Sequence, residues 1–337
     1  MRWLSISGTY RGRSQIGALI LAIAQDGTGP VVLGRTGLRV SQMGLGTAPL
    51  ASIRWNNDAP TAVATAQRAI AAGLTYFDTA PLYGMGESET RLGMALRGRS
   101  VVVATKVGRL LDTAADGSAE VHFDFSYDAA LRSLEGSLRR LHLDRVDIVH
   151  IHDPDEHIED ALTGTLPALI RMREEEVISG VSLGTNTVAT AAAFLDRADL
   201  DCLMVAGRYT LLDQSAAPLI ARCGRQGISY LAAGVFNSGV LARPVAGAWL
   251  DYSPVPAEIL QRVKSIEVVC HRHGTSLIAA ALAFPVANPG VRMIVVGMAS
   301  PNEVDDNVRA FRAGVPADLW DELADEGLVE SLQGGVR

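Results

Sequence analysis

Four titratable side chains stand at or just after the ends of apolar, β-rich runs in this sequence: Asp78, Tyr83, Lys106 and His152. Taken singly, each has an ordinary structural reading, as a turn-capping carboxylate, a half-buried ring, an amine that reaches solvent or a core imidazole. Taken together, they form an acid/base set that can hold and transfer a proton. The set works only if the fold brings the ends of those runs to one place.

Short β-rich runs alternate with amphipathic helical segments, such as Ala59 to Ala72 and Ala129 to Leu141, along most of the chain. We expect buried parallel strands at Gly44 to Thr47, Leu74 to Asp78, Val101 to Lys106, Val146 to His152, Ile178 to Leu183, Leu203 to Ala206, Ile228 to Ala232 and Met293 to Val296. Such a series predicts an α/β fold, a (β/α)8 TIM barrel whose strand ends share one rim. The alternative, an open doubly wound sheet, would carry a Gly-rich phosphate turn after its first strand, and the sequence has none there.

Three segments fall outside this repeat. Residues 241–256 are expected to form a long active-site loop and residues 314–337 a C-terminal cap. In residues 1–30, three arginines precede the apolar run Ile16 to Ala24, an outline that fits either a cleaved signal peptide or an extension from an upstream start codon. We expect residues 1–30 to be poorly ordered and residues 31–337 to form a single domain.

Composition restricts the partners. The 337-residue chain is 48% hydrophobic and 20% charged, and its net charge is -7 without a long basic run, which argues against nucleic acid or an anionic membrane surface. Its three cysteines have no C-x-x-C spacing, so we expect neither a disulfide framework nor a thiolate metal site. We expect a cytoplasmic monomer or weak homo-oligomer that acts on a small molecule.

The segments "YFDTAPLYGMGESETRLG", "VVVATKVGR" and "RVDIVHIHDPD" resemble the signature segments of the aldo-keto reductase superfamily, and the likeness runs from about Leu33 to about Arg309. The resemblance implies that Asp78, Tyr83, Lys106 and His152 form the family's catalytic tetrad, with a nicotinamide cofactor across the barrel mouth. An ammonium beside a phenol lowers the phenol's pKa, so Lys106 is expected to activate Tyr83 while Asp78 holds Lys106. His152 is expected to orient the substrate oxygen.

The same resemblance indicates a cofactor site, although several positions depart from the common pattern. NADP-using relatives place a lysine and an arginine where this chain has Gly297 and Glu303, so we expect NAD to be preferred. Glu303 also has a purely structural interpretation, as a first-turn acid of the last barrel helix. The positions expected to contact the cofactor are Gly46, Thr47, Asn186, Phe236, Asn237, Ser238, Gly239, Gly297, Glu303 and Asn307.

The segments "LMVAGRYTLLDQSA", "GVFNSGVLA" and "WLDYSPVPAEIL" are similar to the aldose 1-dehydrogenase subgroup, which includes L-fucose, D-threo-aldose and L-galactose dehydrogenases and pyridoxal 4-dehydrogenase. This implies NAD-dependent oxidation of an aldose or of pyridoxal at the anomeric carbon, giving a lactone. An NADPH-dependent aldehyde or ketone reductase is the alternative. The expected pocket walls, each of which has plain packing as its other interpretation, are Trp55, Arg208, Tyr209, Trp249 and Tyr252.

Two other classes remain open at this stage. The pair His150 and His152, followed by two aspartates, is how some metal-dependent TIM-barrel hydrolases begin their ligand set. Further ligands at other strand ends are not evident beyond the tetrad, and His271 and His273 are expected to be solvated on a helix, so we expect no metal. A barrel that only senses the nicotinamide state is the second class, and the complete tetrad argues against it.

Overall fold

The computed structural model describes residues 30–51, 57–113, 119–251 and 253–330. Trp55, Tyr252 and the N-terminal extension, all subjects of sequence expectations, lie outside the described residues.

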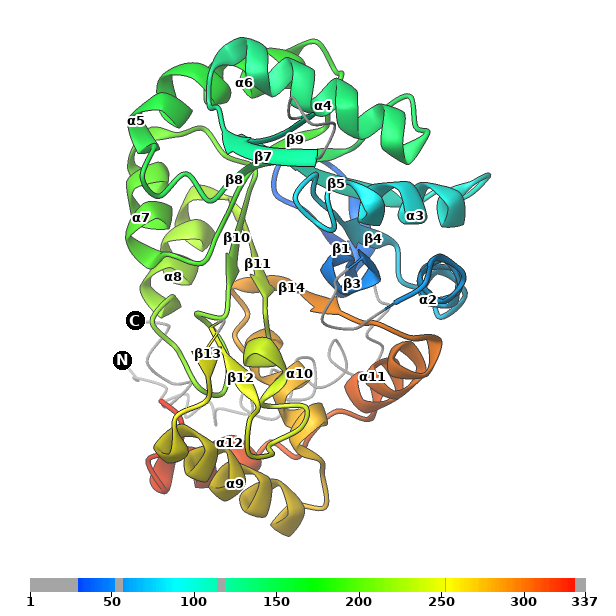
Figure 1. Cartoon of the computed structure of the whole chain (residues 1–337). Helices are drawn as coiled ribbons and strands as arrows, with labels where there is room; N and C mark the ends of the chain where they lie inside the picture. Colours follow the sequence, from blue (N-terminus) through cyan, green and yellow to red (C-terminus); the bar gives the residue numbers. More distant parts are fainter. Residues whose placement is uncertain (1–29, 52–56, 114–118, 252, 331–337) are drawn as a thin grey trace, which may run out of the picture.

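Eight parallel strands close into a barrel, in the order β10-β11-β14-β3-β4-β5-β8-β9. The prediction of a (β/α)8 barrel is therefore confirmed, and Figure 1 shows helices arranged around the strands. The strands are β3 (Met43–Gly46), β4 (Tyr76–Asp78), β5 (Val102–Val107), β8 (Ile148–His152), β9 (Gly180–Thr185), β10 (Cys202–Ala206), β11 (Ser229–Ala233) and β14 (Val291–Gly297).

The helices alternate with these strands, and several of them begin at a residue whose side chain caps the helix. Asp58 caps the first of them by accepting a hydrogen bond from the Thr61 amide at 2.8 Å, and Ser126 accepts one from the Ala129 amide at 3.3 Å. The helices are α2 (Ala59–Ala71), α3 (Glu87–Leu96), α4 (Tyr127–Leu141), α5 (Ile158–Asp160), α6 (Leu166–Glu174), α7 (Val188–Arg197), α8 (Ala217–Gln226), α9 (Ala257–Arg272), α10 (Leu277–Ala287), α11 (Pro301–Ala313) and α12 (Leu319–Asp325), with short turns η1 (Ala48–Ala51), η3 (Ala161–Thr165) and η4 (Asn237–Gly239).

Three two-stranded hairpins accompany the barrel, and the sequence analysis did not anticipate them. The first precedes the barrel, the second follows β5, and the third lies within residues 241–256, where a loop was expected. Their strands are β1 (Pro30–Val32) with β2 (Arg39–Ser41), β6 (Arg109–Thr113) with β7 (Ala119–Phe123), and β12 (Trp249–Leu250) with β13 (Ser253–Pro254).

The described part of the C-terminal segment packs on the outer helices. Helix α12 contacts α9, and the Trp320 ring meets the Phe284 ring of α10 at a centroid distance of 5.6 Å (Figure 1). His273, which was expected to be solvated, instead lies between α9 and α12, where its Nε2 pairs with Glu322 and its side chain is only 12% exposed. None of the described helices is both long enough and apolar enough to cross a membrane.

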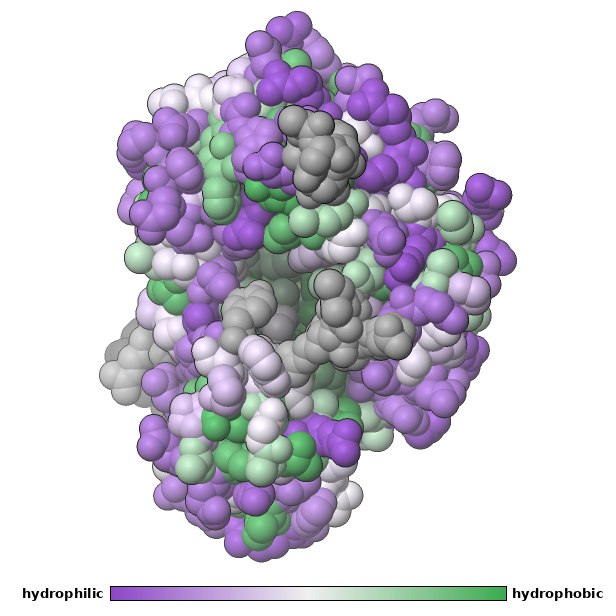
Figure 2. Space-filling view, viewed as in Figure 1, coloured by the Kyte–Doolittle hydropathy of each residue, from purple (hydrophilic) through white to green (hydrophobic). Residues whose placement is uncertain are grey.

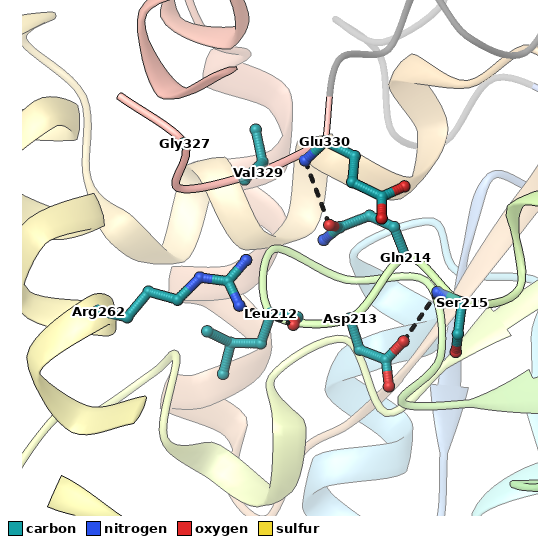
Figure 3. Close-up of a pocket in the computed structure, with 8 residues that line it drawn as sticks. All are labelled: Leu212, Asp213, Gln214, Ser215, Arg262, Gly327, Val329 and Glu330. Atoms are coloured by element: carbon teal, nitrogen blue, oxygen red, sulfur yellow. Dashed lines mark hydrogen bonds between the residues drawn. The ribbon is translucent and has the colours of Figure 1, made fainter. Parts of the chain in front are cut away.

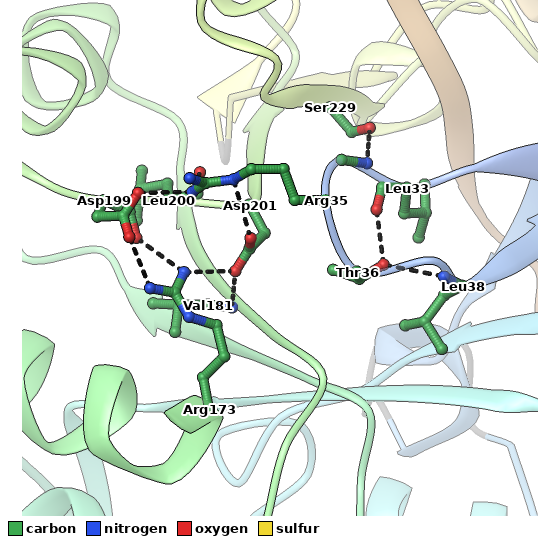
Figure 4. Close-up of polar contacts among 11 residues, drawn as sticks. Leu33, Arg35, Thr36, Leu38, Arg173, Val181, Asp199, Leu200, Asp201 and Ser229 are labelled. Atoms are coloured by element: carbon green, nitrogen blue, oxygen red, sulfur yellow. Dashed lines mark hydrogen bonds and ion pairs between the residues drawn. The ribbon is translucent and has the colours of Figure 1, made fainter. Parts of the chain in front are cut away.

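An ion-pair network closes the amino-terminal end of the barrel (Figure 4). Asp201, which directly precedes β10, accepts a hydrogen bond from the Val181 amide at 2.9 Å and pairs with Arg173 at 2.8 Å, and its side chain is 4% exposed. Arg35, in the turn between β1 and β2, lies 3.5 Å from the same carboxylate. The network therefore ties the N-terminal hairpin to two neighbouring strands.

We predict that Asp201→Ala lowers the free energy of unfolding by about 1–3 kcal/mol, because it leaves the buried Val181 amide without its acceptor and removes the buried one of the two carboxylates that pair with Arg35 and Arg173. The neighbouring Asp199 pairs with Arg35 at 2.5 Å and with Arg173 at 2.6 Å, but its side chain is 52% exposed. Asp199→Ala should therefore lose less than about 1 kcal/mol. Urea unfolding measures both, and equal losses in the two variants would contradict this account.

Candidate active site

The barrel brings the four predicted side chains to one rim. Asp78 and His152 are the last residues of β4 and β8, and Lys106 is the next-to-last residue of β5. Tyr83 lies in the turn between β4 and α3. Because the strands are parallel, their carboxyl ends share the mouth of the barrel.

Asp78 and Lys106 form a buried ion pair. Lys106 Nζ lies 2.6 Å from Asp78 Oδ2, and the two side chains are 3% and 4% exposed. The same Nζ donates a hydrogen bond to the Thr79 carbonyl at 2.8 Å. Burial alone would raise the pKa of Asp78, but Lys106 and His150 bring it below its usual range. For Lys106, burial opposes the charge, yet Asp78 and Tyr83 raise the pKa above its ordinary value. Both groups therefore stay ionised at neutral pH.

Tyr83 packs against this pair. Lys106 Nζ lies 4.8 Å from the centroid of the Tyr83 ring, which meets the His152 ring edge to face at 6.2 Å. Lys106 does act to lower the pKa of Tyr83, as expected, but burial of the phenol is the larger effect and holds that pKa above its ordinary value. Tyr83 is therefore a protonated phenol at neutral pH.

His152 faces the same space as a neutral imidazole. Burial, followed by the charge of Lys106, holds its pKa well below the ordinary value. Its Nε2 lies 3.6 Å from Oδ2 of Asp153, and its buried Nδ1 has no hydrogen-bond partner among the described residues. A neutral imidazole has one N–H, and this ring can offer it to an oxygen at the mouth.

A second polar layer lies directly beneath the tetrad. His150 is fully buried, and its Nε2 lies 3.3 Å from Asp78 Oδ1 and 3.4 Å from the Tyr76 hydroxyl. Burial keeps the pKa of His150 below its ordinary value despite the nearby Asp78 carboxylate. Sequence reasoning considered His150 only as a metal ligand. The spacing that suggested a ligand pair also places His150 on the same strand face as His152, which could have indicated this supporting position.

Several of the predicted cofactor positions also lie at the carboxyl ends of the strands or just after them. Gly46 and Gly297 end β3 and β14, Thr47 directly follows β3, and Asn186 directly follows β9. The Asn186 carbonyl accepts a hydrogen bond from Arg208 Nε at 2.8 Å. Thr47 is fully buried and donates a hydrogen bond to the Asp78 carbonyl at 3.0 Å, so its side chain supports the rim from within.

The loop after β11 carries the remaining predicted cofactor positions except those on α11. Asn237 and Ser238 have φ angles of 45° and 57°, and Phe236 packs partly against the core. Gly239 also lies in the left-handed region, at φ 101°. Asn237 is 3% exposed, and its Oδ1 accepts no hydrogen bond from the described residues. A buried acceptor of this kind fits a donor on a bound group, as a cofactor amide or hydroxyl would provide.

On α11, Glu303 takes part in a helix cap. Its amide donates to Ser300 Oγ at 3.2 Å, and its Oε2 accepts from the Ala299 amide at 2.7 Å. The residue is otherwise exposed, whereas Asn307, one turn later, is 7% exposed. The structural interpretation of Glu303, as a first-turn acid of the helix, is therefore correct, and the side chain is still exposed to solvent.

The predicted substrate positions separate into two groups. Arg208 connects two loops: it donates a hydrogen bond to the Asn186 carbonyl after β9, and it pairs with Asp251 of the β12–β13 hairpin at 2.8 Å. Trp249 lies on β12, next to the η4 turn, and is 42% exposed. Tyr209 was expected to line the pocket, but it is 4% exposed and its hydroxyl accepts a hydrogen bond from Asn288 Nδ2 at 2.9 Å. It packs beneath α10, so we assign it to the core.

The face of the molecule in Figure 2 is hollowed near its centre, between the β6–β7 and β12–β13 hairpins, and apolar residues line part of the hollow. A separate pocket of about 350 Å³ lies between the loop after β10, α9 and the segment after α12 (Figure 3). None of the tetrad side chains lines it. Arg262 crosses this pocket and donates to the Leu328 carbonyl, which fastens the C-terminal segment to the barrel.

Across the described residues, no group of three or more His, Cys, Asp and Glu side chains is placed to hold a metal ion. The three cysteines are buried and free, and burial raises their pKa values, to about 11 for Cys270, so they are not thiolates at neutral pH.

A sequence model of the Aldo/keto reductase family matches residues 42–325. The chain belongs to this family. It is 37% identical to a pyridoxal 4-dehydrogenase of Microbacterium luteolum, with 88% of this chain and 97% of the relative covered. It is 36% identical to a D-threo-aldose 1-dehydrogenase of a Pseudomonas species, with 87% and 96% covered. The suspected family and subgroup are therefore both supported, and the protein is an oxidoreductase.

The fold also agrees with a solved structure of the family. An aldo-keto reductase of Bacillus halodurans in its holo form superposes with a TM-score of 0.75, covering 90% of this chain and 97% of its own, at 24% identity. Because the chain belongs to this family, the metal-dependent hydrolase alternative is excluded. Family membership also implies hydride exchange with a nicotinamide cofactor.

We predict that His150 positions Asp78 in this aldo-keto reductase. His150→Leu should lower kcat about tenfold or more, because Asp78 Oδ1 loses the ring nitrogen that lies 3.3 Å from it and the ion pair with Lys106 can shift. His150→Gln keeps an N–H donor near the same place and should retain most of the activity. Steady-state kinetics with the best substrate, beside a thermal melt of each variant, measure this.

Rescue by glutamine separates positioning from packing. If the leucine variant kept full activity, or if both variants lost it equally while folding normally, His150 would be a core residue without influence on Asp78.

Proposed function

We propose that the protein oxidises a cyclic hemiacetal at its anomeric carbon to a lactone, with NAD as the hydride acceptor. The observation that carries the proposal is the buried Asp78–Lys106 pair, at 2.6 Å, beside Tyr83 and His152 at one barrel mouth. Relatives named as pyridoxal 4-dehydrogenase and D-threo-aldose 1-dehydrogenase support the substrate class. Sugars of the L-fucose, D-arabinose and L-galactose type and pyridoxal are therefore the candidates.

In this proposal each side chain of the tetrad has one role. The bound cofactor supplies the hydride acceptor, and the protein supplies placement and a proton path. The hydroxyl on the anomeric carbon loses its proton to the phenolate form of Tyr83 as the C–H bond gives up a hydride, and the carbon becomes the lactone carbonyl. Lys106 favours the phenolate that must receive the proton, and Asp78 holds Lys106 in place. His152 donates its N–H to the reacting oxygen and orients it.

A substrate panel tests the proposal directly. L-fucose, D-arabinose, L-galactose, pyridoxal and simple aldehydes are assayed with NAD and NADP in both directions, and kcat/KM is compared. We expect oxidation of at least one hydroxylated hemiacetal to dominate. Turnover of simple aldehydes alone, with NADPH, would instead support the aldehyde or ketone reductase.

We predict that Tyr83→Phe lowers oxidative turnover by at least about 100-fold, because it removes the proton acceptor, while the affinity for the cofactor stays nearly unchanged. Steady-state assays measure the oxidative turnover, and quenching of protein fluorescence by the cofactor measures its affinity. Tyr127→Phe is the matched control, since Tyr127 begins α4 and is only half-buried there.

The pH profile of the same enzyme checks the state of the phenol. Because the pKa of Tyr83 lies above its ordinary value, the phenolate fraction grows with pH across the neutral and mildly alkaline range. Oxidative kcat/KM should therefore rise with pH in that range. A flat profile, or a tyrosine variant within tenfold of wild type, would remove Tyr83 from the reaction.

Cofactor choice rests on the start of α11. Gly297 has no side chain and Glu303 carries a carboxylate, bound to the Ala299 amide, so the two cations that would hold a ribose 2'-phosphate are missing at these positions. Arg309, a basic residue of the same helix, pairs with Asp306 at 2.8 Å and is 73% exposed. A carboxylate repels a phosphate but can accept a hydrogen bond from a free ribose hydroxyl.

We predict a wild-type preference for NAD, and a shift toward NADP in Glu303→Arg, measured as the ratio of kcat/KM values for the two cofactors. Because Glu303 also caps α11, Glu303→Gln is the matched control: it keeps the acceptor for the Ala299 amide and removes only the charge. Glutamine should reduce discrimination without reversing it. A wild-type preference for NADP of about tenfold or more would overturn the assignment.

A further inference from the structure

We propose that Asp153 and Arg109 form a site that reads a hydroxyl group next to the reacting carbon of the substrate. The inference rests on the proposed function and goes further, because it names the feature that separates hydroxylated substrates from simple aldehydes. Neither residue belongs to the tetrad, and both lie beside it.

Asp153 is held at the rim by its backbone. It directly follows His152, its φ angle is 44°, and its amide donates to the Gly184 carbonyl at 2.9 Å. The loop that continues from it is anchored by Asp155, whose Oδ1 accepts a hydrogen bond from Thr190 at 2.7 Å. The backbone of Asp153 is therefore held in place, and this fixes the point from which its carboxylate enters the mouth.

One carboxylate oxygen of Asp153 lies between two nitrogen donors. Its Oδ2 is 2.7 Å from Arg109 Nη2 and 3.6 Å from His152 Nε2. The first distance is a charge-assisted hydrogen bond, and the second is longer than a hydrogen bond, so the carboxylate lies beside the His152 nitrogen without occupying its N–H. The side chains of Asp153 and Arg109 are 21% and 23% exposed, so a ligand in the mouth can reach them.

Arg109 is fixed from its other side. It begins β6 directly after Gly108, and its guanidinium carbon lies 5.1 Å from the centroid of the Phe123 ring. The ring of Phe123 packs with His157 at 5.4 Å, which supports this edge of the mouth. Arg109 uses one nitrogen for Asp153, and its buried Nε has no partner among the described residues. The guanidinium is thus oriented by a ring face and a carboxylate while retaining donor capacity.

The chemistry of the substrates fits this pair. In the proposed function the reacting oxygen accepts the N–H of His152. In an aldose, the hydroxyl on the neighbouring carbon lies within hydrogen-bond distance of that oxygen, and in pyridoxal the phenolic hydroxyl, although one carbon further from the reacting carbon, also lies within hydrogen-bond distance of that oxygen. Such a hydroxyl can donate to Asp153 Oδ2 and accept from Arg109. A simple aldehyde has no group for this place and leaves the paired charges without a ligand.

D-arabinose and 2-deoxy-D-ribose differ only in that hydroxyl and provide the test. We expect the wild type to favour D-arabinose in kcat/KM by about 10- to 100-fold, as for a hydrogen bond to a charged group. In Asp153→Asn and in Arg109→Met the preference should fall to within about threefold, mainly through loss on D-arabinose. Pyridoxal and its 3-deoxy analogue repeat the comparison if pyridoxal is the better substrate.

Arg132→Met is the matched control, because Arg132 also pairs with an aspartate, Asp124 at 3.4 Å, but is 56% exposed on α4. The preference of Arg132→Met for D-arabinose over 2-deoxy-D-ribose, as a ratio of kcat/KM values, should equal that of the wild type. Thermal melts and cofactor binding show whether each variant is folded and competent.

The outcomes separate this inference from the function on which it rests. If the wild type oxidises neither sugars nor pyridoxal, the proposed function fails. If it oxidises D-arabinose but shows no preference over the deoxy sugar, or if folded Asp153→Asn loses activity equally on both, the function stands and the hydroxyl-reading pair is refuted.

Discussion

The buried ion pair between Asp78 and Lys106 is the interaction on which the candidate site depends. Removing two such charges from water costs several kcal/mol per ion, so the pair persists only where close geometry and further hydrogen bonds compensate it. Here Lys106 also donates to the Thr79 carbonyl at 2.8 Å, and the Nε2 of His150 lies 3.3 Å from Asp78 Oδ1. These groups come from three strands of one closed sheet or from their ends, and therefore the pair is compensated only when the barrel is complete.

The buried polar groups of the barrel differ in how completely they are hydrogen-bonded. At the amino-terminal end, Asp201 meets a backbone amide and two arginines, and such satisfaction suits a structural closure. Among the described residues, the buried polar atoms without a hydrogen-bond partner include four at or just beneath the mouth, namely Arg109 Nε, His150 Nδ1, His152 Nδ1 and Asn237 Oδ1, whereas Gln42 Oε1, Ser133 Oγ and Tyr230 OH lie elsewhere. Native folds satisfy most buried polar atoms, so a concentration of exceptions indicates a place prepared for a ligand.

The barrel strands could be predicted from the sequence because parallel strands are covered on both faces and read as short apolar runs. The hairpin β6–β7 was missed because its strands carry charged residues, although Asp116-Gly117 between them is a hairpin signal. Tyr209 was misassigned because its partner, Asn288, is distant in sequence, and no local pattern reveals that contact. The burial of Tyr83 could not be predicted from the sequence either, and it raises the pKa of the phenol by more than Lys106 lowers it.

The position of Lys106 depends in turn on packing deeper in the barrel. Tyr76 belongs to the apolar cluster of the barrel interior, yet its hydroxyl reaches His150 at 3.4 Å, so one side chain joins the apolar and the polar layers. Its ring fits because β3 has Gly44 alongside, where a Cβ would approach the ring at 2.7 Å. Burial holds the pKa of Tyr76 well above its ordinary value, which keeps a neutral hydroxyl beside the imidazole. A side chain at Gly44 would displace the ring and, through His150 and Asp78, move the ammonium that Tyr83 contacts.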